Sequence, residues 1–269
     1  MRQPPPDLLE QIDAARVERG QIALWHTGGA GYVIRTSGAT LYLDPFTGPS
    51  ESDRWVRMLA PPFDASRVGR CDLILSTHEH FDHCDRDALT KLLVVTSAQL
   101  AGPTSSIKRA RGFGWPEERL RPLAPGESIE AAGVRVTAVR SHDPMAEGCN
   151  GYVLEAEGLV LVNMGDSLWY DDIGKELAGW RVDAICLSVA ENPVGGTYYM
   201  SEVDAGRIAR DVGAKVLIPH HFDLWEWVAL DPRRIQTVAP WYAPEAQIRP
   251  ARYGERMTLA RAGGGVAVF

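Results

Sequence analysis

The sequence lacks the features of a membrane, secreted or nucleic-acid-binding protein. No apolar run approaches the ~20 residues that a membrane-spanning helix needs, and no apolar segment of a signal peptide follows Met1–Pro6. The four cysteines include no C-x-x-C pair, which indicates free thiols in a reducing compartment. The net charge of −7 argues against a nucleic-acid enzyme, which usually needs a basic surface. We therefore expect a cytoplasmic protein with no membrane and no nucleic-acid partner.

The length of 269 residues and an apolar fraction of 45% suit a single globular domain over residues 1–269. Strands are expected at 22–25, 32–35, 40–43 and 93–96, and helices at 85–92 and 201–212. Each half of the chain is rich in strands with helices between them. This pattern predicts an α/β fold of the α+β type, a four-layer αββα sandwich. Residues 47–70 are expected to form an irregular loop over the functional site.

Three of the seven histidines lie with an aspartate in the run Thr77–His83, THEHFDH. The run follows an apolar segment, 71–76, that is expected to be a buried strand. Alternation places His78 and His80 on one side of an extended backbone. Imidazole together with carboxylate suits zinc, iron or manganese, and two adjacent groups of ligands predict two divalent metal ions.

The other ligand candidates also follow apparent strands, so they can converge on one rim. The first metal would be held by His78, His80 and His142, and the second by Asp82, His83 and either His220 or His221, with both oxygens of Asp166 bridging the two. Taken singly, each later candidate is more often a turn residue. Because all of them follow apolar strands, the case that they are metal ligands is stronger for the set than for each residue alone.

The order of these residues resembles the metallo-β-lactamase superfamily. The His-x-His-x-Asp-His run is followed by a histidine, then Gly165-Asp166, then another histidine, and the similarity spans about Ile22 to Met257. The resemblance implies an αββα sandwich with a dinuclear site along one edge. In that family the last ligand stands two residues after a proline. Pro219 therefore implies His221 as the ligand and His220 as a neighbour that supports it.

Five segments resemble more closely the L-ascorbate-6-phosphate lactonase group of that superfamily. They are Ile22–Trp25, Gly29–Tyr32, Glu191–Pro193, Met200–Ser201 and Ile218–Trp225. This resemblance implies a manganese-associated hydrolase of a sugar-acid lactone, with or without a phosphate. The chain is shorter than that group around 47–70 and 143–150, the loops that would shape the substrate pocket.

Two metals about 3.5–4 Å apart lower the pKa of a bridging water and polarise a substrate oxygen. The motif therefore predicts hydrolysis of an ester-like bond by a metal-bridging hydroxide. Asp82 is the expected catalytic residue, because it can orient the hydroxide and carry a proton to the leaving group. Candidate substrate contacts are Glu191, Asn192, Tyr198, Tyr199 and Trp225. Asp44 is expected to support the site by hydrogen bonding, and His26 to be structural.

The expected partner is a small molecule, and an anionic one, because bound metals bring local positive charge. Whether the protein forms a homo-oligomer is left open.

Four other functions are alternatives to a lactone hydrolase. A glyoxalase II type of thioesterase shares the histidine run, but its C-terminal helical domain is missing. The acidic balance opposes a phosphodiesterase. Redox enzymes of the di-iron flavoprotein type place a carboxylate where His80 stands, so His80 favours a hydrolase. A non-catalytic binding protein on the same fold is the remaining alternative, and it would be expected to lose ligands.

Overall fold

Two β-sheets form the centre of the molecule, and the computed structural model describes residues 1–263 and 265–269. The first sheet has the strand order β15-β14-β1-β2-β3-β4-β5-β6. Its strands are β1 (Gln21–Gly28), β2 (Gly31–Arg35), β3 (Thr40–Leu43), β4 (Leu73–Leu75), β5 (Gln99–Gly102), β6 (Leu120–Pro122), β14 (Arg256–Ala262) and β15 (Gly265–Val268). From β3 to β6 the neighbouring strands are parallel, whereas the others pair antiparallel.

The second sheet has the strand order β13-β12-β11-β10-β9-β8-β7. Its strands are β7 (Ser128–Ala131), β8 (Val134–Arg140), β9 (Asn150–Ala156), β10 (Leu159–Asn163), β11 (Ala184–Ser188), β12 (Val216–His220) and β13 (Gln247–Ile248). The strands from β10 to β13 run parallel, and those from β7 to β10 alternate in direction.

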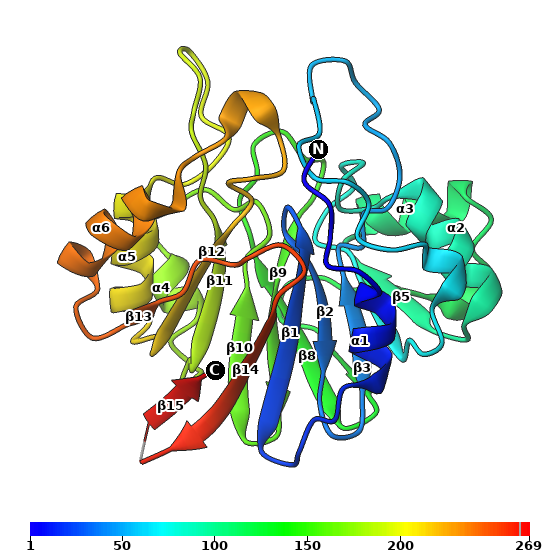
Figure 1. Cartoon of the computed structure of the whole chain (residues 1–269), viewed down its shortest axis with the longest axis horizontal. Coiled ribbons are helices and arrows are strands. Elements are labelled where there is room, and N and C mark those ends of the chain that lie inside the picture. Colours follow the sequence, from blue (N-terminus) through cyan, green and yellow to red (C-terminus); the bar gives the residue numbers. More distant parts are fainter. Residues whose placement is uncertain (264) are drawn as a thin grey trace.

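Helices cover the outer face of each sheet (Figure 1). On one side lie α1 (Leu8–Ala14), α2 (Arg86–Val95) and α3 (Thr104–Gly112), and on the other α4 (Ile173–Glu176), α5 (Glu202–Asp211) and α6 (Pro232–Tyr242). Short 3-10 turns span Ala65–Arg67, Glu117–Arg119 and Glu226–Val228. The four-layer αββα sandwich expected from the sequence is confirmed.

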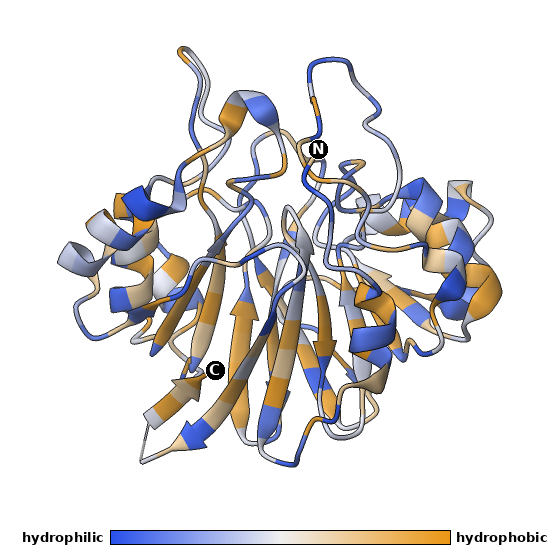
Figure 2. Cartoon of the chain, viewed as in Figure 1, coloured by the Kyte–Doolittle hydropathy of each residue, from blue (hydrophilic) through white to orange (hydrophobic). Residues whose placement is uncertain are grey.

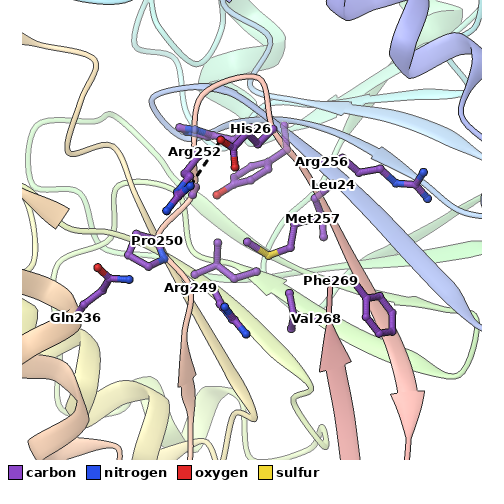
Figure 3. A pocket seen from close by; sticks show the side chains of 14 residues that line it. Leu24, His26, Gln236, Arg249, Pro250, Arg252, Arg256, Met257, Val268 and Phe269 are labelled. Atoms are coloured by element: carbon purple, nitrogen blue, oxygen red, sulfur yellow. Dashed lines mark ion pairs between the residues drawn. The ribbon is translucent and has the colours of Figure 1, made fainter. Parts of the chain in front are cut away.

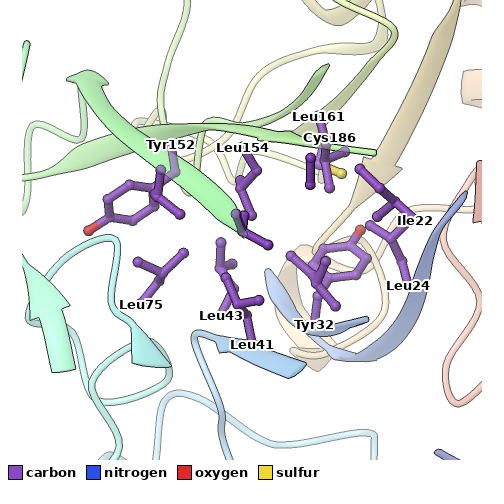
Figure 4. Packing of buried hydrophobic residues seen from close by; sticks show 14 of the residues in the cluster. Ile22, Leu24, Tyr32, Leu41, Leu43, Leu75, Tyr152, Leu154, Leu161 and Cys186 are labelled. Carbon is purple, nitrogen blue, oxygen red and sulfur yellow. The ribbon is translucent and has the colours of Figure 1, made fainter. Parts of the chain in front are cut away.

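Apolar side chains from both sheets meet between them. Leu43 and Leu75 of the first sheet and Tyr152 and Leu154 of the second are almost wholly buried in this layer (Figure 4). Orange hydrophobic bands recur along the strands of both sheets, and the outer helices show both hydrophobic and hydrophilic colour (Figure 2). Burial of this layer is the main term that holds the two sheets together.

Local sequence explains one helix boundary and one wrong prediction. Helix α5 begins after Ser201, whose side chain forms a reciprocal capping box with Asp204. The strand expected at 93–96 does not form, because α2 continues to Val95. Val94 is 82% exposed, so this apolar run is an outer helix surface. A short apolar run does not by itself distinguish a strand from a helix end.

The strands that lead into the candidate ligands end at the same edge of the sandwich. Parallel strands bring their carboxyl ends together; β8 shares the direction of β10, since both pair antiparallel with β9. The segments 76–83, 141–143, 164–166 and 220–221 therefore meet at the edge that is uppermost in Figure 1. Loops over 44–64 and 189–201 rise above this edge, as expected for the first of them.

A separate cavity of about 270 Å³ lies between the β14–β15 and β12–β13 margins of the two sheets. His26, Arg249 and Met257 are among its lining residues (Figure 3). No group of side chains that could hold a metal lines this cavity in the described part of the chain. Nor does any described helix have the length and apolarity to cross a membrane.

Candidate metal centre

Seven side chains form three overlapping groups of three. Within each group, the ligand atoms lie within 4.8 Å of one another. The groups are His78, His80 and Asp143; His78, His83 and Asp166; and Asp82, His83 and His221. Six of these seven residues were expected from the sequence. The strand ends thus bring together residues that lie far apart in the chain.

The structure places Asp143, rather than His142, beside His78 and His80. His142 is exposed, and its ring lies 6.4 Å from the ring of Tyr170, outside all three groups. Asp143 takes its place, with Oδ2 at 3.4 Å from both His78 Nε2 and His80 Nδ1. In the extended segment after β8, neighbouring side chains point to opposite sides. An error of one residue therefore exchanges an inward side chain for an outward one.

The remaining ligands surround a second point that is more deeply buried. Asp166 Oδ2 lies 3.2 Å from His83 Nε2 and 3.4 Å from His221 Nε2. Asp82 Oδ2 lies 3.6 and 3.5 Å from the same two nitrogens. The other oxygen of Asp166 accepts a hydrogen bond from Ser188 Oγ at 2.7 Å. Oδ2 of Asp166 therefore faces the two histidines, while its other oxygen is held by Ser188, and the bridging role expected from the sequence stays a prediction.

Two buried nitrogens indicate that these residues fit a metal. Nε2 of His83 and Nε2 of His221 are buried, and neither has a hydrogen-bond partner among the described residues. The other ring nitrogen of His83, Nδ1, lies 2.8 Å from Asp44 Oδ2. If Nδ1 carries the proton that Asp44 accepts, the lone pair of Nε2 is left facing the site, the usual arrangement for a metal-binding histidine.

The charges in the site favour a cation. Burial alone would lower the pKa of His83, but the carboxylates of Asp166, Asp82 and Asp44 raise it well above its usual value. Burial opposes ionisation of Asp166, yet His221 and His83 hold its pKa well below the usual range. The ionised form of Asp166, which a metal ligand needs, is therefore favoured.

Asp44 supports the cluster from below, where the sequence predicted such a role. It is fully buried and accepts hydrogen bonds from the backbone N–H and the hydroxyl of Thr77, at 2.8 and 2.7 Å. Its φ of 44° and that of His221, 68°, are rare for residues with a side chain. Such strain at a functional site is held in place by the surrounding contacts. His220 points elsewhere, with Nδ1 at 3.1 Å from the hydroxyl of Tyr32.

The five expected substrate contacts divide into three that line a cavity and two that do not. Tyr199 and Trp225 line a cavity of about 380 Å³ above the ligands, and so does Tyr198. Glu191 and Asn192 do not line it. Glu191 pairs with Arg234, and Asn192 Oδ1 accepts from the backbone N–H groups of Tyr198 and Tyr199 at 2.6 and 3.0 Å. Both polar groups are used to hold the loop.

Sequence reasoning missed several residues of this cavity. Trp55, Glu79 and Arg109 line it, together with the newly placed Asp143. Glu79 stands inside the histidine run, so its position was available as a signal. Trp55 and Arg109 come from separate segments with no motif around them, and only the folded chain brings them to the site.

Comparison with known proteins identifies the family. A model described as beta-lactamase superfamily domain matches residues 23–221. The match covers well over half of the chain, so the protein belongs to the beta-lactamase superfamily. This membership supports a hydrolase, and the histidine and aspartate clusters at the strand ends could hold a metal.

Two relatives and two solved structures show what the chain is similar to. Probable L-ascorbate-6-phosphate lactonases from Escherichia fergusonii and Salmonella choleraesuis are 24% and 25% identical, over 96% of this chain and 84% of theirs. A metallo hydrolase from Ignicoccus hospitalis has a TM-score of 0.71 at 18% identity, covering 90% of this chain and all of that one. An isothiocyanate hydrolase from Delia radicum gut bacteria has a TM-score of 0.72 at 17% identity, covering 89% of this chain and all of that one. The solved structures support the fold.

Proposed function

We propose that the protein is a metal-dependent hydrolase of an ester-like bond, with a sugar-acid lactone as the first candidate. The observation that carries this proposal is the set of seven ligand side chains beside a cavity of about 380 Å³. Relatives named as lactonases, similar over 96% of the chain, support the choice of a lactone.

Two divalent ions bound here would supply Lewis acidity and lower the pKa of a bound water. One would be held by the first group and the other by Asp82, His83 and His221, with Asp166 shared between them. Carboxylate ligands favour harder ions than imidazole does. A ligand set with Asp143 in place of His142 therefore favours manganese or iron more than the set expected from the sequence does. Zinc is still a candidate.

The side chains around the reacting bond have separate tasks. Trp225 Nε1 donates a hydrogen bond to Asp82 Oδ2 at 3.1 Å, which orients this carboxylate. Water adds to the lactone carbonyl carbon, the ring C–O bond breaks, and Asp82 carries the proton from the water to the leaving alkoxide. The product is the open hydroxy acid. Tyr199, whose ring lies 4.8 Å from that of His221, forms the wall beside the ligands.

The proposal is tested by a substrate panel on protein loaded with Mn²⁺ or Zn²⁺. We expect turnover of lactones, and its loss in His80→Ala, while the exposed neighbour His142→Ala keeps its activity. Metal content is measured on the same samples. Cleavage of thioesters or phosphodiesters alone would replace the lactone by another hydrolase reaction. No turnover of any class would leave a binding protein.

A further inference from the structure

We propose that the substrate is an uncharged lactone or ester that presents an apolar ring face, without a phosphate. This inference rests on the proposed hydrolase function and names the substrate class of the same site. Three features of the cavity carry it: an aromatic wall, an arginine that is already occupied, and a glutamate oxygen with no partner.

Aromatic side chains form one wall of the cavity. The ring of Trp55 lies 5.6 Å from that of Trp225, and Phe81 is also 5.6 Å from Trp225. Tyr198 packs edge-on against Trp55 at 6.5 Å. All four residues line the cavity. Rings in such arrangements offer large apolar surfaces for a flat apolar face, and they offer a phosphate group almost no hydrogen bonds.

Arg109 is the one arginine or lysine among the described residues that line the cavity. Its charge is already engaged: a terminal nitrogen donates to Glu51 Oε1 at 2.7 Å, and Nε donates to the carbonyl of Cys84 at 3.0 Å. The neighbouring Arg54 does not line the cavity. Its guanidinium lies over the ring of Trp227, 4.2 Å from the ring centre. A phosphate would have to compete with Glu51 for the charge of Arg109.

Glu79 adds a negative charge with no compensating cation. Its Oε1 accepts from the backbone N–H of Glu147 at 2.6 Å, while Oε2 is buried without a hydrogen-bond partner among the described residues. A carboxylate in the lining of the cavity repels an anion. The phosphate of a phosphorylated lactone would lie away from the metals, where it would meet Glu51 and Glu79.

This substrate class departs from two earlier expectations. The sequence suggested an anionic substrate, on the argument that bound metals bring positive charge. The named relatives carry a phosphorylated sugar lactone in their names. Metal charge acts at the reacting carbonyl, but the distal part of the cavity is set by Glu51, Glu79 and Arg109, which together carry one net negative charge.

The test compares matched substrates on the metal-loaded enzyme. Gluconolactone and its 6-phosphate differ only in the phosphate, and dihydrocoumarin presents an aromatic face. We expect kcat/KM to fall from dihydrocoumarin to gluconolactone to the 6-phosphate, with at least about a tenfold gap at the last step. Faster cleavage of the 6-phosphate than of gluconolactone would overturn the inference.

Two variants test the causes separately. Glu51→Gln releases Arg109, so the preference against the 6-phosphate should shrink roughly fivefold. An unchanged preference would overturn the role given to this ion pair. Trp55→Ala should lower kcat/KM for dihydrocoumarin by about 3- to 10-fold while affecting gluconolactone less. Trp241→Ala is the control, since Trp241 is 83% exposed on α6 and does not line the cavity.

A binding measurement keeps this inference separate from the proposed function. Dihydroquinolinone is an uncharged lactam that resists hydrolysis, and 6-phosphogluconate is a larger anion that carries the phosphate. Their affinities are measured by quenching of tryptophan fluorescence, whether or not any lactone is cleaved. Tighter binding of the lactam supports the inference even if all turnover is absent, in which case only the proposed hydrolysis fails. Tighter binding of 6-phosphogluconate overturns it.

Discussion

The two halves of the ligand cluster differ in how firmly the fold holds them. In the group of Asp82, His83 and His221, the side chains are 9%, 1% and 0% exposed. Asp44 and Trp225 fix two of them by hydrogen bonds, and the backbone N–H of His221 donates to the carbonyl of Gly29 at 3.1 Å. We call this group the buried subsite.

The group of His78, His80 and Asp143 is more open, and we call it the open subsite. Its openness lies at one ligand, because His78 and Asp143 are only 0% and 7% exposed. The His80 side chain is 34% exposed, and its Nε2 lies 3.2 Å from the carbonyl of Met145, a residue that is itself 63% exposed. The comparison teaches that one subsite is preorganised while the other depends on a surface loop. We therefore expect the buried subsite to bind its metal more tightly.

The largest effect is expected when the buried subsite loses a ligand. In His221→Ala, the metal loses a nitrogen ligand in a place that water cannot readily fill. We expect metal content to fall and kcat to drop by at least about a hundredfold. Elemental analysis and initial rates measure both, and His142→Ala provides the control. Full metal content in His221→Ala would contradict the proposal that the buried subsite binds its metal more tightly than the open subsite.

A smaller effect is expected at the open subsite. Asp143→Ala removes one carboxylate from a position where water can replace it, because His80 beside it is partly exposed. We expect the affinity of the weaker metal to fall roughly 10- to 100-fold and that of the tighter metal to stay unchanged. Competition with a metal-sensitive dye resolves the two affinities. If His142→Ala lost metal and Asp143→Ala did not, the corrected assignment would be wrong.

The support beneath the buried subsite can be tested without removing a ligand. Asp44→Asn keeps the shape of the side chain, and asparagine tolerates the positive φ at this position. If the amide nitrogen faces His83 Nδ1, that atom must accept a hydrogen bond rather than donate one. The proton then sits on Nε2 and blocks metal binding. We expect an affinity loss of about 10-fold, at the low end for such changes. Asp72→Asn, near the start of β4, is the control.

The ligands predicted from sequence were those with strong local patterns. His78, His80, Asp82 and His83 come from one run, and Asp166 follows a strand directly, so strand direction alone brings them to one edge. The side on which Asp143 points depends on β8 ending at Arg140 and on the contacts of the following segment. A sequence pattern with boundaries uncertain by one residue cannot fix that direction.

The substrate region was less predictable, for a physical reason. Glu191 and Asn192 are polar residues in a loop, and their hydrogen bonds are used up by Arg234 and by the backbone of Tyr198 and Tyr199. Backbone groups that a loop leaves unpaired must be satisfied by such side chains. A polar loop residue near a site is therefore as often structural as it is a substrate contact. The aromatic wall depends on packing between distant segments.

The smallest effect concerns the order in which a chelator removes the metals. If the buried subsite is the tighter one, limiting EDTA should first remove the metal of the open subsite. That first loss should lower Tm only slightly, because the open subsite is tied to a surface loop and constrains little else. The second loss should lower Tm further, since a ligand that binds only the folded state stabilises it according to its affinity. Differential scanning fluorimetry with elemental analysis follows both steps. Simultaneous loss of the two metals would mean that the shared ligand Asp166 couples the subsites more strongly than their different burial separates them.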